Sequence, residues 1–194
     1  MAKITRASLW SLEAYAKERD TFRTKVMAHK KTRKLFIGEH VTLDFEDELT
    51  VRYQIHEMLR AERTFEEQGI LDEIEAYAPL VPDGRNFKAT MLIEYPEVDE
   101  RRRELAKLIG IAERVWVQVK GCAKVFAIAD EDLDRDTEEK TSAVHFMRFE
   151  LSEDMAQALK RGVALAAGID HANYRHSVDP VAPGLRDALT KDFA

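Results

Sequence analysis

The segment Leu35-Phe-Ile-Gly-Glu-His-Val-Thr-Leu-Asp-Phe45 decides the fold, because the spacing of apolar residues changes there from helical to extended. Apolar residues at positions 35, 37, 41, 43 and 45 repeat every second residue, which predicts one half-buried strand. Glu39 falls on the apolar side of this alternation, so we expect a buried carboxylate partnered by an arginine of the following helix. That pair is either a structural ion pair or a carboxylate poised as a base or ligand.

The segments on either side of this strand predict further helices and strands. Asp47 is expected to cap a long helix that runs to about Glu66. Paired helices are expected within residues 1–34, with Asp20 as the cap of the second helix unless the two form one bent helix. More strands are expected at 87–95, at 115–119, up to about 128 and at 141–151. Ser152 is expected to cap a helix to about 167, and residues 168–194 are expected to form a C-terminal extension.

Hairpin-linked strands placed among helices favour the α+β class. The expected architecture is a single domain over residues 1–194, with a mixed or mainly antiparallel sheet of about five strands and helices packed against it. A chain of 194 residues is long enough to bury a sizeable core without a disulfide or a structural metal.

Composition narrows the classes of function. The formal net charge of -6 argues against a protein that coats nucleic acid, because phosphate binding requires positive charge. The single cysteine, Cys122, cannot form an internal disulfide or a cysteine-only metal site. The sequence shows no secretory leader and no run of roughly 20 apolar residues that would span a membrane. A cytoplasmic location is therefore expected, and neither membrane nor nucleic acid is an expected partner.

Several local signatures of catalysis are absent from the sequence. It contains no glycine-rich phosphate loop and no dinucleotide fingerprint, so no nucleotide cofactor is predicted. It contains no nucleophile elbow, and none of its six histidines follows a glutamate by three residues, as in ferritin-like di-iron bundles. The cofactor stays open, with a transition metal as one option.

The helix that follows the strand carries an arginine column, which is the first candidate site. Its members fall at steps of four, four and three and therefore share one helix face. They are Arg52, His56, Arg60 and Arg63, with Gln54 and Glu57 on the neighbouring stripe. Three guanidinium groups in a column can bind a carboxylate or a phosphate. The alternative is a solvated surface joined by weak intrahelical ion pairs.

Histidines and carboxylates from distant segments form a second candidate site, for iron, manganese or zinc. The ligands would converge from a strand, a helix, a second strand and the tail: His40, Glu57, His145 and His171. A histidine such as His145 on an apolar strand face is equally typical of a hydrogen-bonded core residue. Arg148 points to the other side of that strand and, with Glu39, joins the candidate anion-binding residues.

Four segments carry a resemblance to a known family. They are Gly38-Glu-His-Val-Thr-Leu-Asp-Phe-Glu46, Thr50-Val-Arg-Tyr-Gln-Ile-His-Glu-Met-Leu-Arg60, Ser142-Ala-Val-His-Phe-Met-Arg-Phe149, and Asp170-His171 with Tyr174. The chain resembles, over nearly its whole length, the bacterial family catalogued as domain of unknown function 3501 (DUF3501). The resemblance implies no assigned catalytic residues. It implies rubrerythrin-like and iron–sulfur redox proteins as partners, and a role near oxidative stress, by association and not by mechanism.

Three hypotheses of different classes follow. The first is an accessory or ligand-binding protein linked to a redox system, whose arginine column binds an anion or a partner. The second is a metal-dependent enzyme that uses the histidine and glutamate residues. The third is a structural interaction module, such as a homo-oligomer, that uses the acidic loop at 130–140 or the basic segment at 17–34.

Overall fold

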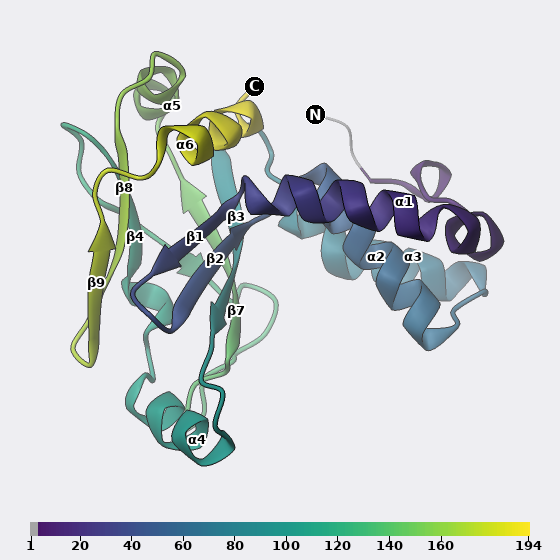
Figure 1. Ribbon diagram of the computed structural model, residues 1–194, viewed down its shortest axis with the longest axis horizontal. Helices are drawn as coiled ribbons and strands as arrows, with labels where there is room; N and C mark the ends of the chain where they lie inside the picture. Colours follow the sequence, from purple (N-terminus) through teal and green to yellow (C-terminus); the bar gives the residue numbers. More distant parts are fainter. Residues whose placement is uncertain (1–3) are drawn as a thin grey trace.

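Two antiparallel sheets face each other, and a group of helices projects from one side of them, in the computed structural model, which describes residues 4–194 (Figure 1). We call the projecting helices, residues 6–31 and 48–77, the helical lobe, and the rest of the described chain the sheet body. The arrangement is a single domain and confirms the predicted α+β class. The sequence predicted one sheet of about five strands, whereas the strands form two sheets, of five and four strands. The strand predicted at 115–119 is confirmed and lies in the second sheet.

The first sheet has five strands, and its neighbouring strands are all antiparallel. In spatial order the strands are β1 (Lys34–Ile37), β2 (Val41–Phe45), β3 (Asn86–Ile93), β7 (Val144–Glu150) and β6 (Ile128–Ala129). The prediction of one strand over 35–45 is wrong, because the chain reverses at residues 38–40 and pairs β1 with β2. Glu39 lies exposed in that turn, so its predicted burial is wrong as well.

Gly38 makes the β1–β2 turn possible. Its φ of +70° is in the left-handed region that favours glycine. A Cβ atom there would lie 2.5 Å from the hydroxyl oxygen of Tyr174. That hydroxyl donates to the carbonyl of Ile37 at 2.7 Å and accepts from the amide of His40 at 3.1 Å. The turn of the first sheet is thereby tied to the last strand of the second.

The second sheet has four antiparallel strands in the order β5 (Val125–Phe126), β4 (Val115–Val119), β8 (Leu165–His171) and β9 (Tyr174–Val178). The predicted helix to about residue 167 ends earlier, because α5 spans only Glu153–Lys160 and Gly162 follows with a φ of +86°. Residues 168–194 are not an extension, since β8 and β9 form half of this sheet. The apolar run at 165–169 is buried throughout, and such a run has no period that separates strand from helix.

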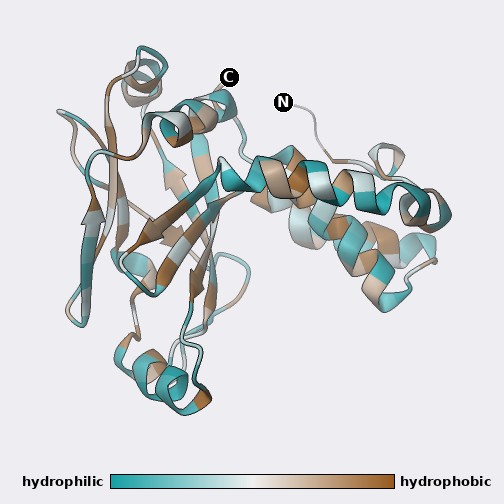
Figure 2. Ribbon diagram, viewed as in Figure 1, coloured by the Kyte–Doolittle hydropathy of each residue, from teal (hydrophilic) through white to brown (hydrophobic). Residues whose placement is uncertain are grey.

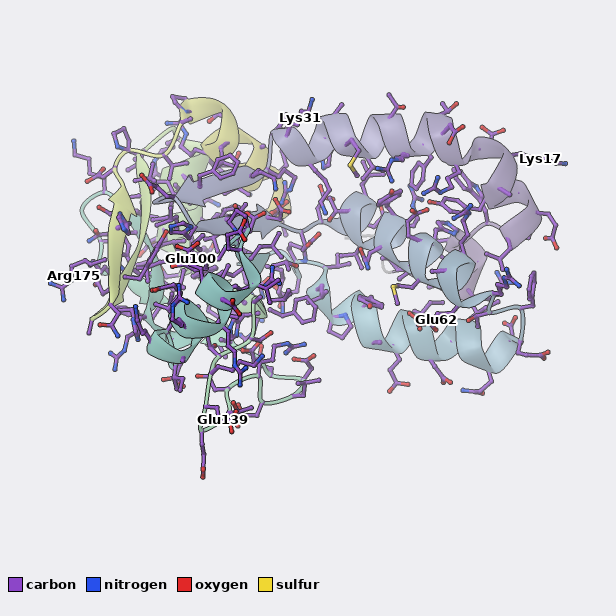
Figure 3. All side chains as sticks on the ribbon, turned by 60° about the horizontal axis from the view of Figure 1, so that its bottom comes forward. Lys17, Lys31, Glu62, Glu100, Glu139 and Arg175 are labelled. Carbon is purple, nitrogen blue, oxygen red and sulfur yellow. The ribbon has the colours of Figure 1, made fainter. Side chains whose placement is uncertain are left out.

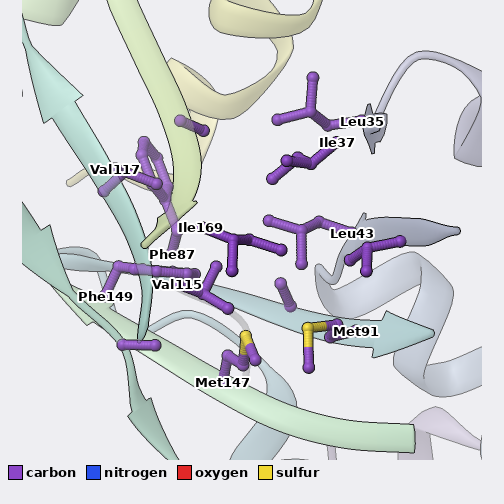
Figure 4. Close-up of a cluster of buried hydrophobic side chains, with 14 of the residues drawn as sticks. Leu35, Ile37, Leu43, Phe87, Met91, Val115, Val117, Met147, Phe149 and Ile169 are labelled. Atoms are coloured by element: carbon purple, nitrogen blue, oxygen red, sulfur yellow. The ribbon is translucent and has the colours of Figure 1, made fainter. Parts of the chain in front are cut away.

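The main core lies between the two sheets (Figure 4). Leu43, Phe87 and Phe149 of the first sheet are fully buried there, facing Val117 and Ile169 of the second. The alternation predicted for 87–95 is confirmed, because its odd-numbered residues from 87 to 93 are buried and its even-numbered ones are half-buried on the outer face of the first sheet. That outer face is the surface beside the helical lobe.

The helical lobe consists of α1 (Leu12–Lys31), α2 (Glu48–Glu62) and α3 (Glu67–Tyr77). Ser11 caps α1, which is a single helix that continues through Asp20. The predicted cap of α2 is confirmed, because Asp47 and Thr50 form a reciprocal capping box. Figure 2 shows hydrophilic and hydrophobic residues alternating along α1. In Figure 3, Lys17 marks its outer end and Lys31 the end beside the sheets.

Arg33 lies at the joint between the lobe and the sheet body, two residues after α1, and its Nε is 3.6 Å from the carboxylate of Asp47, the cap of α2. Its guanidinium is only 2% exposed and donates to the carbonyls of residues 45, 46 and 188. It also forms a 2.5 Å ion pair with Asp192. Asp192 lies in η4 (Thr190–Asp192), directly after α6 (Pro183–Leu189). Burial raises the pKa of Asp192 to about 6, although Arg33 acts to lower it.

The remaining helix, α4 (Val98–Lys107), covers the end of the sheet body opposite α6 (Figure 1). Within residues 4–194, no helix combines the length and apolar character needed to cross a membrane.

Candidate ligand-binding groove

The structure disperses the arginine column. Arg52 is half-buried, 3.5 Å from Glu48 in the same helix, with its guanidinium over the ring of Phe22. Arg60 is exposed, and Arg63 is exposed at the left-handed C-terminal cap of α2. The three arginines therefore do not converge on one pocket. They lie along a helix surface that is half-buried at Arg52 and exposed at Arg60 and Arg63.

Glu57 faces α1 instead of joining the column. It accepts two hydrogen bonds from Arg19, at 2.8 and 2.6 Å, and one from the hydroxyl of Tyr15 at 2.6 Å. The bonds from Arg19 lower the pKa of Glu57 to about 2. Gln54 is exposed on another side of α2, facing α3 and the first sheet. Glu57 thus ties α1 to α2. Glu57 and Gln54 do not share a site.

His56 lies inside the lobe, 1% exposed. Its ring stacks on Tyr15 with a centroid distance of 4.5 Å and lies 5.5 Å from the ring of Trp10. Its buried Nδ1 has no hydrogen-bond partner among residues 4–194. Burial, assisted by the positive charge of Arg52, lowers the pKa of His56 to about 4. The ring is therefore neutral at physiological pH and acts as part of an aromatic core.

The four predicted metal ligands lie apart. His40 stacks on Tyr95 at 4.0 Å, and Glu57 lies in the helical lobe. His171 has its Nε2 3.1 Å from the carbonyl of Ile109. The predicted convergence is wrong, and no cluster of three or more histidine, cysteine or acidic side chains within residues 4–194 is arranged to hold a metal ion.

His145 is a fully buried, hydrogen-bonded histidine. Its Nδ1 lies 2.6 Å from Asp130. Its Nε2 lies 3.0 Å from the carbonyl of Ser142 and from the hydroxyl of Thr141. Asp130 also binds Arg135 at 3.0 Å. These contacts anchor both ends of the acidic loop at 130–140 to β7. His145 is therefore a hydrogen-bonded core residue, which was one of the two alternatives from the sequence.

A groove of about 290 Å³ separates the helical lobe from the outer face of the first sheet. One wall comes from α3 and η2 (Ala78–Leu80), and the other comes from β3 and β7 with the start of the acidic loop. Ala76, Leu80 and Phe146 give it apolar surface. Its charged lining consists of two cations, Lys88 and Arg148, and three carboxylates, Glu75, Glu131 and Asp132. We call it the Lys88 groove. Such a mixture of apolar walls with a few charged groups is typical of a small-molecule site.

Lys88 is the distinctive residue of this groove. It is half-buried on β3 and, among residues 4–194, its amine forms neither an ion pair nor a hydrogen bond. Burial lowers the pKa of Lys88, and the neighbouring charge of Arg148 adds to this effect. Arg148 is already occupied, since it binds Glu131 at 2.7 Å and Glu150 at 2.5 Å. Lys88 is therefore the cation available for a ligand.

A second hollow, of about 260 Å³, adjoins the Lys88 groove and shares Leu80 and Phe146 with it. It lies between α2 and strands β2 and β3. We call it the Glu46 hollow after the buried carboxylate at its base. Gln54 lines this hollow and Arg148 lines the groove, so two predicted anion-binding residues do lie along one continuous surface.

The sequence signals for Lys88 and Glu46 are weak. Lys88 occupies an outward position of β3, where a polar residue normally faces solvent, and Glu46 directly follows the last residue of β2. Only the packing of the lobe over this face of the sheet places them in hollows.

Comparison with known proteins gives two findings. The family model described as "Protein of unknown function (DUF3501)" matches residues 3–193. A crystal structure described as a novel protein of unknown function from Burkholderia pseudomallei K96243 is similar at 52% identity with a TM-score of 0.95. The match covers 100% of both chains. A search of the curated proteins gave no significant match.

Proposed function

The chain belongs to the DUF3501 family, and from that premise we propose that it is a binding protein for a small organic carboxylate with an apolar body, held in the Lys88 groove. The proposal keeps the first hypothesis from the sequence, a ligand-binding protein. It replaces the arginine column by a site on the outer face of the first sheet. The link to redox or oxidative-stress partners, which the family resemblance implies, stays a prediction.

The observation that carries the proposal is the unpaired amine of Lys88 beside apolar walls. A half-buried ammonium has lost part of its hydration, and a ligand carboxylate would replace it with a charge-assisted hydrogen bond. The rings and methyl groups of Phe146 and Leu80 would bury the apolar part of the same ligand. The ion pairs of Arg148 fix the floor of the groove and leave Lys88 as the partner.

The test is isothermal titration calorimetry of the protein with octanoate and with 4-phenylbutanoate. The methyl ester of each compound is the uncharged comparison. We expect both acids to bind and both esters to bind more weakly. Lys88→Met should weaken binding of the acids by about tenfold to a hundredfold, because a hydrogen bond between charged groups contributes roughly 1.5–3 kcal/mol.

Lys107→Met is the matched control, because Lys107 lies on α4, away from the groove, and pairs with Glu104 at 2.7 Å. It should bind the acids as the wild type does. Equal binding of acids and esters, or equal loss in both variants, would contradict the role of Lys88.

A further inference from the structure

Glu46 is a buried carboxylate that no cation neutralises by direct contact. It is 7% exposed and accepts hydrogen bonds from the hydroxyls of Thr50, at 2.5 Å, and Thr90, at 2.7 Å. Among residues 4–194 it forms no ion pair, and Lys30, which lines the same hollow, does not reach it. Its two neutral donors hold the carboxylate in place and leave its charge without a partner.

The next acidic residue of the hollow is already paired. Asp44 lies two positions before Glu46 on the same face of the first sheet, and Lys34 approaches it to 3.0 Å. The uncompensated negative charge of the hollow is therefore that of Glu46. A buried charge of this kind is stabilised by an opposite charge that brings its own hydrogen-bond donors.

The unpaired carboxylate of Glu46 and the unpaired amine of Lys88 lie on one face of the first sheet. Glu46 is opposite Lys88 across strands β2 and β3, since its amide donates to the carbonyl of Lys88 at 2.8 Å. Its carboxylate turns along the sheet to the hydroxyl of Thr90, two residues beyond Lys88 on β3 and on the same face, whereas the side chain of Lys88 lines the adjoining groove. Leu80 and Phe146 line both hollows and give this surface its apolar part.

We propose that the ligand is a zwitterion whose ammonium group binds Glu46 and whose carboxylate binds Lys88, with an apolar segment between them. The inference rests on the proposed carboxylate-binding function and adds the second charged end. A short peptide with a free amino terminus and an ω-amino acid share this chemistry. An ammonium group carries three donors and fits a carboxylate that already has one donor on each oxygen.

The experiment is a calorimetric comparison of ligands that differ at one end. The ligands are Leu-Leu, N-acetyl-Leu-Leu, the methyl ester of Leu-Leu, 8-aminooctanoate and its N-acetyl form. In the wild type, we expect N-acetylation to weaken binding by at least tenfold, because it removes the ammonium charge. Tighter binding of Leu-Leu than of 8-aminooctanoate would identify a peptide, the reverse an ω-amino acid, and both results support the proposal.

Two variants assign the ends of the ligand by a thermodynamic cycle. In Glu46→Gln, the free and N-acetylated peptides should bind equally, whereas the preference for the acid over the ester should persist. In Lys88→Met, the preference for the acid should disappear and the preference for the free amine should persist. Glu138→Gln, an exposed change in the acidic loop, is the control that should alter neither preference.

The outcomes separate this inference from the function on which it rests. If octanoate binds and N-acetylation has no effect in the wild type, the zwitterion is ruled out and carboxylate binding stands. An amine preference that survives intact in Glu46→Gln also overturns the inference. If neither octanoate nor Leu-Leu binds, both proposals fail. The comparison of ligands in the wild type decides the matter even if a variant does not fold.

Discussion

The sheet body and the helical lobe are held together by different forces. The body encloses one contiguous apolar core between its sheets, with Phe87 and Phe149 fully buried. The lobe has two small apolar clusters, and its helices also depend on polar contacts such as that between Arg19 and Glu57. Apolar burial is insensitive to pH, whereas buried ionisable groups are not. The lobe, whose apolar clusters are small, should therefore lose a larger share of its stability than the body when its ionisable groups change charge.

The difference also explains where the candidate groove lies. A sheet that packs one face into a core leaves its other face free, and here the lobe covers that face only partly. Charged residues such as Glu46 and Lys88 are tolerated at this boundary because neither the body nor the lobe needs them for its own core.

The largest expected effect is in the core of the body. Phe149→Ala should lower the free energy of unfolding by about 4 kcal/mol, because it removes a buried ring and leaves a cavity. Chemical denaturation followed by circular dichroism measures the change. Phe65→Ala, at a ring that is 64% exposed in the lobe, should cost less than about 0.5 kcal/mol. Similar losses in the two variants would mean that the ring of Phe149 is not packed in a core.

The second effect is at the joint. Arg33→Met should cost about 3 kcal/mol, since it leaves Asp192 buried without its partner. Relative to the wild type, hydrogen exchange in the variant should accelerate more in α1 than in β3. The reason is that the joint attaches the lobe to a body that keeps its own core. Arg114→Met, at an exposed arginine, is the control. Uniform acceleration in both regions would show that lobe and body unfold as one unit.

The third effect is the loss of lobe stability in acid. His56 has a pKa of about 4 when folded and 6.5 as its ordinary value, so the unfolded chain binds the proton more readily. Its contribution is present above pH 6.5 and is lost as the pH falls towards 4, by at most about 3 kcal/mol. His56→Phe should flatten the pH dependence of unfolding between 4 and 6.5. His176→Gln, at an exposed histidine, should leave the pH dependence unchanged.

The joint should respond in the opposite direction over an overlapping range. The pKa of Asp192 is raised from 3.8 to about 6, so the folded chain binds the proton more readily. Its contribution to stability is present below pH 3.8 and is lost as the pH rises through 6. Asp192→Asn should therefore reduce the fall in stability between pH 4 and 6. Chemical denaturation of the wild type and of the variant at pH 4 and at pH 6 gives the comparison. The same change in unfolding free energy between the two pH values in both proteins would contradict the prediction.

The smallest effect is expected from the arginine column. Arg52→Ala should change the free energy of unfolding by less than about 0.5 kcal/mol, because its ion pair with Glu48 lies at the surface and within one helix. It should also leave octanoate binding unchanged, since Arg52 lines neither hollow. A marked loss of octanoate binding would return the candidate site to α2.

Local patterns in the sequence predicted much of the fold. The cap at Asp47 and the alternation from Phe87 to Ile93 are properties of neighbouring residues, and both are confirmed. Two of the errors in the predicted fold share one cause, which is that apolar spacing alone does not reveal where a chain reverses. It missed the turn at Gly38, and it extended a helix into β8.

The candidate site was beyond prediction for a different reason. Glu46 and Lys88 are neighbours because β2 and β3 pair in one particular register, with the amide of Glu46 donating to the carbonyl of Lys88. No spacing in the sequence encodes that register. The arginine column, in contrast, was visible as a pattern, and the pattern described one helix surface and not a pocket.

The contact between Gly38 and Tyr174 has a consequence for how a single substitution would spread through the molecule. Ile37 pairs with Val41 across the first turn, and the Tyr174 hydroxyl bonds to the carbonyl of Ile37 and to the amide of His40. Only a residue without a side chain lets that hydroxyl approach so closely. A side chain at position 38 would displace Tyr174 and loosen the second sheet from the first, so a change in one short turn would become a defect of the whole sheet body.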